Sequence, residues 1–170
     1  MELREKLQYP ERDLQKEQKI KELLLQFSAL AVEADGKMRG EPLLEELNRL
    51  LPKGRFLRWE DVSSYLGWTD ADTLARDLAL PEAPLVEDIT REETEYLVQR
   101  ILEDPAGETV GYYLEMLDRT FPGTSVSELI FNPEWCEDYE GDGEPSAEEI
   151  VEIAFRSRNN LLELGDRYGK

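Results

Sequence analysis

Five carboxylates in the last third of the chain have a spacing that could hold a calcium ion. An EF-hand loop needs oxygen ligands at positions 1, 3, 5, 7 and 12 and a glycine at its bend. These ligand positions are occupied in order by Asp138, Glu140, Asp142, Glu144 and Glu149, with Gly143 at the bend. Pro133 opposes this interpretation because it prevents an incoming helix, and Pro145 removes a backbone donor from the loop. We therefore expect no metal and no cofactor, and keep calcium binding as an alternative.

The residue types needed for most catalytic sites are missing. Histidine is absent and Cys136 is the only cysteine. This composition removes the commonest general base and every Ser/His or Cys/His nucleophilic pair. Chemistry by carboxylates alone remains open, because glycosidases and magnesium-dependent enzymes use it. We predict that the chain is not an enzyme. A single cysteine also forms no disulfide within one chain, which favours a reducing, cytoplasmic setting.

Negative charge is concentrated in the second half of the chain. Residues 1–85 have a net charge of −4, whereas residues 86–170 have a net charge of −15. From Thr120 to Phe155 there are ten acidic residues and no basic one. Like charges at this density cost stability, but their field attracts a cationic partner. They also exclude direct binding of nucleic acid, whose phosphates need lysine and arginine. The alternative is a face that serves only solubility.

Aromatic residues lie inside this acidic stretch. The run from Phe131 to Trp135 reads Phe-Asn-Pro-Glu-Trp, and Tyr112 precedes it in the sequence. Aromatic anchors surrounded by charged residues are typical of the centres of protein interfaces. The alternative is that Phe131 and Trp135 complete the hydrophobic core.

The elements that carry these residues are predicted to be helices. Apolar residues at helical spacing predict a helix over about residues 13–34, and the charged residues before it are expected to fray. Gly36 and Gly40 are expected to bracket a turn, with Pro42 at the first position of a second helix.

Two shorter helices are predicted next. The first spans about residues 59–66 and has Gly67 placed as a left-handed cap. Thr69 with Asp72 resembles a capping box that opens the second helix. The spacing is that of a helix-turn-helix, but the acidic residues of the second helix would repel DNA. We therefore interpret the pair as a packed helical hairpin.

Prolines at positions 81 and 84 and a change in charge density predict a domain boundary. We expect a helical domain over residues 1–85 and an acidic helical domain over residues 86–170, in an all-α fold. No run of apolar residues is long enough to span a membrane. In the second domain, further helices are predicted from the capping box of Thr90 and Glu93, from about Glu108, over one turn at residues 128–131, and from the capping box of Ser146 and Glu149 to a cap at Gly165.

Three motifs follow one another in the second domain. They are Phe121-Pro122-Gly123, the run Ser-Glu-Leu-Ile-Phe-Asn-Pro over residues 127–133, and the helix start at residues 146–151 after an acidic, glycine-containing gap. This order resembles the bacteriocin immunity proteins of the colicin/pyocin DNase type, over residues 88–160. The resemblance implies a four-helix bundle with a one-turn third helix, here preceded by a small N-terminal helical domain.

The resemblance also implies a partner and the residues that contact it. Such proteins act in the cytoplasm, bind the nuclease domain of a toxin beside its active site, and exclude DNA. Glu128 stands where the family has an interface Asp, Phe131 stands at the first of two tyrosines, and Asn132 replaces the second. The preceding helix carries the surface that selects the partner in the family. The predicted partner-binding residues are Glu108, Tyr112, Glu115, Asp118, Ser127, Glu128, Phe131, Asn132, Glu134 and Trp135.

We therefore predict a non-catalytic immunity protein whose cognate partner is a toxin, with a basic nuclease domain as its target and no contact with membrane. Two alternatives stay open besides a carboxylate-only enzyme. One is an acidic calcium-binding adaptor. The other is a DNA mimic that inhibits a nucleic-acid enzyme, which would space its charges along an elongated face rather than gather them around one aromatic patch.

Overall fold

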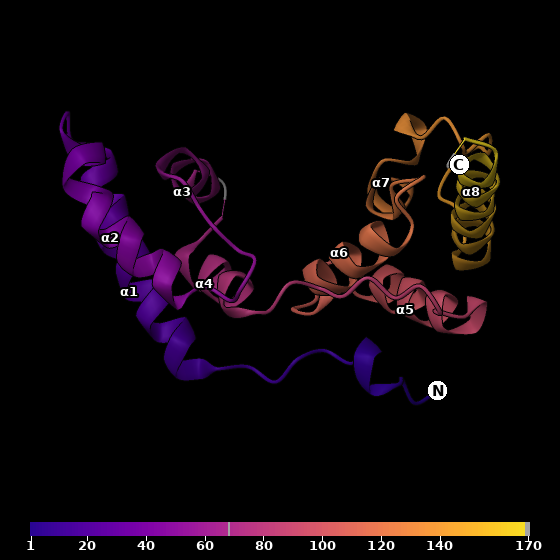
Figure 1. Ribbon diagram of the computed structural model, residues 1–170, viewed down its shortest axis with the longest axis horizontal. Coiled ribbons are helices and arrows are strands. Elements are labelled where there is room, and N and C mark those ends of the chain that lie inside the picture. Colours follow the sequence, from indigo (N-terminus) through magenta and orange to yellow (C-terminus); the bar gives the residue numbers. More distant parts are fainter. Residues whose placement is uncertain (68, 169–170) are drawn as a thin grey trace. The chain divides into compact units, whose positions relative to one another are not determined.

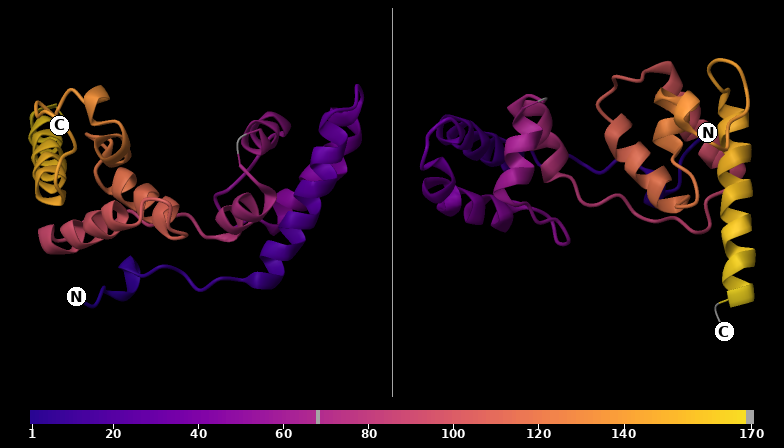
Figure 2. Two further views of the ribbon diagram at one scale, coloured as in Figure 1. Left: turned by 180° about the vertical axis from the view of Figure 1, so that it is seen from behind. Right: turned by 90° about the horizontal axis from the view of Figure 1, so that it is seen from above.

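The computed structural model describes residues 1–67 and 69–168, and this part of the chain contains helices and no strands (Figure 1, Figure 2). The all-α prediction is therefore confirmed. None of the helices in these ranges is both long and apolar enough to cross a membrane. The chain divides into two compact units, one formed by residues 10–82 and one by residues 1–9 together with residues 83–170. The predicted division after residue 85 had placed residues 1–9 with the first unit.

The unit of residues 10–82 is organised around its longest helix, which contacts the other three (Figure 1). The apolar face of this helix contributes Ile20, Leu24 and Phe27, all nearly inaccessible to solvent, to a core that Leu47 and Val62 complete. The helices are α1 (Leu14–Ala31), α2 (Gly36–Leu50), α3 (Trp59–Leu66) and α4 (Ala71–Ala79).

Two glycines expected in a turn lie inside α2 instead. The helix begins at Gly36 and contains Pro42, so the predicted start at the proline is wrong. Close packing explains the glycines. A Cβ at Gly36 would lie 1.8 Å from the carbonyl oxygen of Leu30, and one at Gly40 would lie 2.1 Å from Cζ3 of Trp59. These positions exclude a side chain because other groups occupy the space. The tendency of glycine to interrupt helices, on which the prediction relied, carries no information about such contacts.

The caps around α3 and α4 also differ from the prediction. Gly67 has φ −72° and remains in the right-handed region, so it is not a left-handed cap. Asp70, rather than Thr69, caps α4, because its side chain accepts a hydrogen bond from the backbone N–H of Thr73 at 2.8 Å. The structure therefore has an N-cap by Asp70, one residue further along, in place of the predicted capping box of Thr69 and Asp72.

Replacing Gly40 with alanine is expected to destabilise the protein by about 1–3 kcal/mol, because the added methyl group overlaps the ring of Trp59. That ring already packs on Phe27 with centroids 4.1 Å apart, which leaves it little room to move. Urea unfolding followed by circular dichroism measures the change. A matched control is Gly111→Ala in the helix Val110–Thr120 (α6) of the other unit. A Cβ there would meet nothing within 4 Å, and a gain of about 0.5–1 kcal/mol is expected. A Gly40→Ala protein as stable as the parent would contradict this packing.

The second unit contains the four α-helices predicted for the acidic half. They are α5 (Arg91–Glu103), α6 (Val110–Thr120), α7 (Val126–Phe131) and α8 (Ala147–Tyr168), with short 3-10 turns η1 (Glu5–Leu7) and η2 (Pro133–Trp135). Helix α5 packs against α8, and the core between the helices includes Leu97, Ile101, Leu117, Leu129 and Ile150.

The capping boxes predicted at the starts of α5 and α8 are confirmed. The hydroxyl of Thr90 accepts from the backbone N–H of Glu93 at 3.2 Å, and the Glu93 carboxylate accepts from the N–H of Thr90 at 2.9 Å. Ser146 and Glu149 form the same reciprocal pair at the start of α8. Helix α8 then continues through Gly165, so the predicted cap there is wrong. Glycine alone does not end a helix when its backbone keeps right-handed angles.

The first nine residues are anchored rather than frayed, and we call them the N-terminal strap. The guanidinium of Arg4 donates to both carboxylate oxygens of Glu93, from Nε at 2.5 Å and from Nη2 at 2.7 Å, and Nη1 donates to Asp88 at 2.9 Å. Leu7 is fully buried, and the ring of Tyr9 meets that of Tyr112 edge-on with centroids 5.5 Å apart. The strap therefore completes the core of this unit beside α5 and α6.

Charge pairing holds the strap at the start of α5. Hydrogen bonds from Lys6 and Arg4 lower the pKa of Asp88 to about 2. The bond from Arg4 also lowers the pKa of Glu93, which keeps this carboxylate charged while it caps α5. Both acids therefore remain ionised at neutral pH, and their pairing with the strap weakens only in strong acid.

Candidate protein-binding surface

Helix α7 is held in place by hydrogen bonds to Asp118 on α6 and to Ser125, the residue just before the helix. Asp118, near the end of α6, accepts from the hydroxyl of Ser127 at 2.6 Å and from its backbone N–H at 3.1 Å. Ser125 caps the helix by accepting from the N–H of Glu128 at 3.2 Å. Because Asp118 binds the first turn of α7, it fixes the position of that turn and adds a favourable negative charge at the helix N-terminus.

The inward face of α7 is apolar, which orients the rest of the helix outward. Val126 and Leu129 are fully buried. The helix stops at Asn132, the residue before Pro133, where the backbone leaves the helical region. The turn η2 then follows directly and packs on α7.

This arrangement exposes aromatic side chains beside carboxylates. Phe131 is 46% exposed and Trp135 is 69% exposed, so the alternative that both complete the core is wrong. Glu128 and Glu134 are exposed on the same short segment. We refer to Glu128, Phe131, Glu134 and Trp135 as the α7 surface. Large apolar side chains in water are costly unless a partner covers them, which makes this surface the best candidate for binding.

A groove continues the α7 surface. It has a volume of about 410 Å³ and lies between the end of α7 and residues 136–146, which connect η2 to α8 and which we call the acidic loop. The ring of Tyr139 folds over Gly141, where a Cβ would lie 2.5 Å from the tyrosine hydroxyl. The groove is lined by Ile130, Phe131, Pro133, Glu134, Tyr139 and residues 141–144. Its walls are therefore partly aromatic and its rim is negatively charged, which suits a long cationic side chain with an apolar stem.

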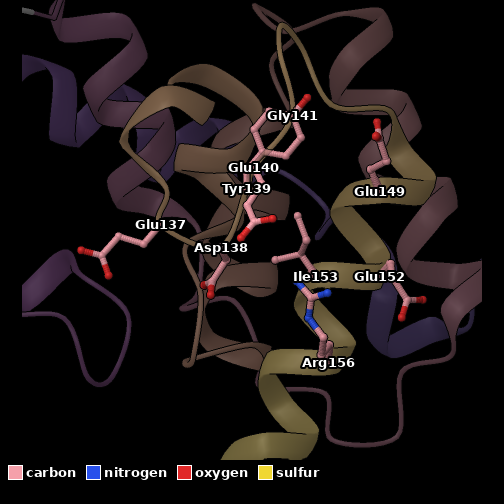
Figure 3. A pocket seen from close by; sticks show the side chains of 9 residues that line it. All are labelled: Glu137, Asp138, Tyr139, Glu140, Gly141, Glu149, Glu152, Ile153 and Arg156. Carbon is pink, nitrogen blue, oxygen red and sulfur yellow. The ribbon is translucent and has the colours of Figure 1, made fainter.

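A second hollow, of about 500 Å³, separates the acidic loop from α8 (Figure 3). Three of its carboxylates do not converge: Glu137 on the loop points away from Glu149 and Glu152 on α8. The carboxylate of Glu149 instead accepts from the backbone N–H of Ser146 at 2.8 Å.

The structure does not support the alternative of a calcium loop at residues 138–149. Within residues 1–67 and 69–168, no group of three or more acidic, cysteine or histidine side chains is placed to hold a metal ion. Gly143 does have the positive φ, 97°, of a bend. The bend alone is insufficient, because a calcium ion requires the oxygen ligands to surround it.

The remaining predicted contact residues fall into three groups. Tyr112 is buried, with 8% exposure, so it cannot be a surface contact as predicted. Asp118 and Ser127 bind each other and position α7. Glu115 lies one turn before Asp118 and is partly exposed, whereas Glu108 is exposed at the opposite end of α6. The α7 surface is therefore compact, and Glu108 lies outside it, before the start of α6.

The packing of Tyr9 explains why the prediction of Tyr112 as a surface residue was wrong. The ring of Tyr9 covers Tyr112, and Tyr9 belongs to a segment for which we predicted no contacts. Leu7 and Tyr9, just before Pro10, were a usable signal, because two apolar side chains inside a charged terminus usually have a packing partner.

Cys136 is a natural probe of the electric field at the α7 surface. Its Sγ lies 3.9 Å from a carboxylate oxygen of Glu128. Burial raises the pKa of this thiol, and the negative charges of Glu128, Asp138 and Asp118 raise it further.

We expect the alkylation rate of Cys136 by iodoacetamide to keep rising with pH after the rate of an unstructured cysteine peptide has levelled off. The thiolate is the reactive form, and nearby carboxylates disfavour it. Mass spectrometry over a pH series gives the profile. Glu128→Gln should shift the profile to lower pH, whereas Glu95→Gln, the same change of charge on α5, should leave it in place. Equal profiles for all three proteins would show that Glu128 exerts no field at the thiol.

The geometry and charge of the α7 surface are the basis for inferring a function. Comparison with family models, with curated proteins and with solved structures finds no match for this chain.

Proposed function

We propose that this chain is an immunity-type inhibitor that binds the basic domain of a toxin through the α7 surface. The observation that carries the proposal is the exposure of Phe131 and Trp135 within a stretch of 36 residues, 120–155, that has ten acidic and no basic residues. A merely solubilising surface needs charge but no exposed aromatic rings. A protein interface uses both, with rings as anchors and charges as guides.

The nature of the partner follows from the sign of the field. A surface that itself binds nucleic acid must be basic, because lysine and arginine replace the counterions of phosphates. A nuclease domain therefore offers the cationic face that the α7 surface would attract. Binding there would exclude DNA by occupying the site and by repelling phosphates. The proposal places this inhibition in the cytoplasm of the cell that makes the toxin.

The two components of the surface would act on different rates. Carboxylates such as Glu128 and Glu134 would raise the association rate, since long-range attraction steers the encounter. Phe131 and Trp135 would lower the dissociation rate, because removing them from the complex re-exposes apolar area. The compact patch favours this reading over a DNA mimic, which needs charge spread along an extended face.

The direct test mixes the purified chain with the nuclease domain of the toxin encoded next to its gene. We expect a one-to-one complex and loss of DNA cleavage at equimolar ratio. Unimpaired cleavage in the presence of excess chain would overturn the proposal.

Charge reversal then tests the role of the field. Glu128→Lys and Glu115→Lys should each slow association about three- to tenfold at low ionic strength, and the difference should shrink as salt screens it. Surface plasmon resonance at several salt concentrations measures both rates. The matched control is Glu95→Lys, an identical change of net charge on α5. Equal slowing by all three variants would mean that total charge, and not the charge on the α7 surface and on the neighbouring end of α6, steers binding.

A further inference from the structure

The C-terminal end of α8 has an apolar face that the rest of its unit does not cover. Ile150 and Ala154, near the start of the helix, are fully buried. On the continuation of the same face, Leu161 is 43%, Leu162 is 63% and Leu164 is 48% exposed. Figure 2 (right) shows this end of α8 extending past α5, α6 and α7. The apolar stripe of α8 is therefore longer than the core that it packs against.

The part of the α8 apolar face that the bundle covers ends near Leu161. Leu161 still reaches the bundle, because a Cβ at Gly123 would lie 2.6 Å from its Cδ1. Gly165 lies one turn beyond Leu161, and a side chain there would meet nothing within 4 Å. The face around Leu162 and Gly165 is thus open, and the small glycine would let another helix approach closely.

The charge around this face differs from that of the rest of the chain. Residues 156–168 hold Arg156, Arg158, Arg167, Glu163 and Asp166, a net charge of +1 in a chain of −19. The acidic stretches of two copies, residues 120–155, would repel each other. A basic partner would likewise be drawn to the acidic stretch before residue 156 rather than to this end of α8.

The order of residues along one edge of the face is self-complementary. Arg158, Leu162 and Asp166 follow at intervals of four, so they form a row one turn apart. The guanidinium of Arg158 is held over the rings of Phe155 and Phe121, at 4.5 Å and 5.0 Å from their centroids. Its position is therefore fixed at one end of the row, with an acid at the other end.

We propose that this end of α8 binds a second copy of the chain in an antiparallel pair. A two-fold axis at Leu162 places the leucines of the two copies against each other and sets Arg158 of each copy opposite Asp166 of the other. Such an interface is isologous and closed, so it gives a dimer rather than a filament. It is small, so we expect a dissociation constant on the order of 10 µM. The inference is independent of the proposed inhibitory function.

Sedimentation equilibrium of the full chain over a concentration series is the test. The expected mass at high concentration is twice the monomer mass of 19.7 kDa. Leu162→Glu places two like charges at the axis and should raise the dissociation constant at least about tenfold. Leu85→Glu is the matched control, because Leu85 is 51% exposed elsewhere in the same unit. Circular dichroism confirms that both variants keep their helices.

A second pair of variants tests the orientation. Asp166→Arg sets arginine against Arg158 of the other copy and should weaken the dimer about tenfold at low salt, less at high salt. Glu163→Arg makes the same change of net charge on the outward face of the helix and should not weaken it. Equal effects of the two variants would overturn the antiparallel pairing.

Two results would overturn the proposal as a whole. One is a monomer at every concentration up to about tenfold above the expected dissociation constant. The other is a monomer whose backbone amides around Leu162 are protected from hydrogen exchange, because another part of the same chain would then cover this face. Loss of toxin binding has no bearing on either result.

Discussion

Trp135→Ala is expected to weaken the complex with the toxin domain about 30- to 1,000-fold, the largest effect that we predict for a single substitution. Interface tryptophans commonly contribute about 2–4 kcal/mol when they are truncated. Trp135 is 69% exposed in the free chain, so its ring is available to a partner without rearrangement. Isothermal titration calorimetry at fixed salt gives the affinity. Because α7 buries Val126 and Leu129 independently of this ring, the thermal stability of the free chain should remain within about 0.5 kcal/mol of the parent.

The control uses the other exposed aromatic residues. Phe131→Ala should weaken binding by a smaller factor than Trp135→Ala, because the phenyl ring is smaller than the indole. Phe131, at the edge of the groove, is also less exposed than Trp135, at 46% against 69%, so it offers a partner less area to cover. Phe56→Ala makes the same change at a phenylalanine that is 74% exposed in the other unit and outside the α7 surface. If Phe56→Ala weakens the complex and Trp135→Ala does not, the contact surface has been misplaced.

Leu7→Ala is expected to lower the stability of the second unit by about 2–4 kcal/mol, although Leu7 lies in the first turn of the chain. Its side chain is fully buried, so its removal leaves a cavity in the core of this unit. For a domain of about 100 residues this change corresponds to a fall in Tm of roughly 10–20 °C. Hydrogen exchange should show lower protection along α5 and α6, and unchanged protection along α1.

The matched control for the strap is Leu85→Ala. It removes the same atoms from a leucine of the same unit that is 51% exposed, and its effect should stay within about 0.5 kcal/mol. Equal stability of the Leu7→Ala and Leu85→Ala proteins would mean that the strap is not part of the folded unit in solution.

Local information was sufficient for most helices. The capping boxes at Thr90 and Ser146 involve residues three apart, so the sequence contains both partners of each pair. Helix α3 was also predicted over its observed residues, although its predicted left-handed cap was wrong. Such features depend on neighbours in the chain, and for this reason they could be predicted.

Features that depend on distant residues could not be predicted. Arg4 pairs with Glu93 across 89 positions, and nothing near Arg4 in the sequence indicates that contact. Gly40 appeared to be a turn residue because its neighbour across the helix interface, Trp59, is identified only by the fold. Helix propensity is a weak guide wherever tertiary packing decides.

The candidate site was predicted in part for the same reason. The acidic stretch and its aromatic residues were visible in the sequence, but their exposure was not. Tyr112 and Trp135 are both aromatic residues near carboxylates, yet Tyr9 covers the first and nothing in the described part of the chain buries the second. Only the packing of the strap and of α7 separates the two.

The strap also determines the order in which this chain can fold. Residues 1–9 belong to the same compact unit as the residues from 83 onward, so the unit of residues 10–82 is inserted within the sequence of the other unit. We call the inserted unit the guest and the other unit the host. During synthesis the strap emerges before residues 10–82, and α5 and α6 become complete roughly 5–20 s after it at ordinary ribosome speeds. The guest can fold in that interval, which replaces a long flexible loop by a compact domain and lowers the entropy cost of closing the host. A mutation that unfolds the guest would therefore weaken the host without altering any of the contacts within it.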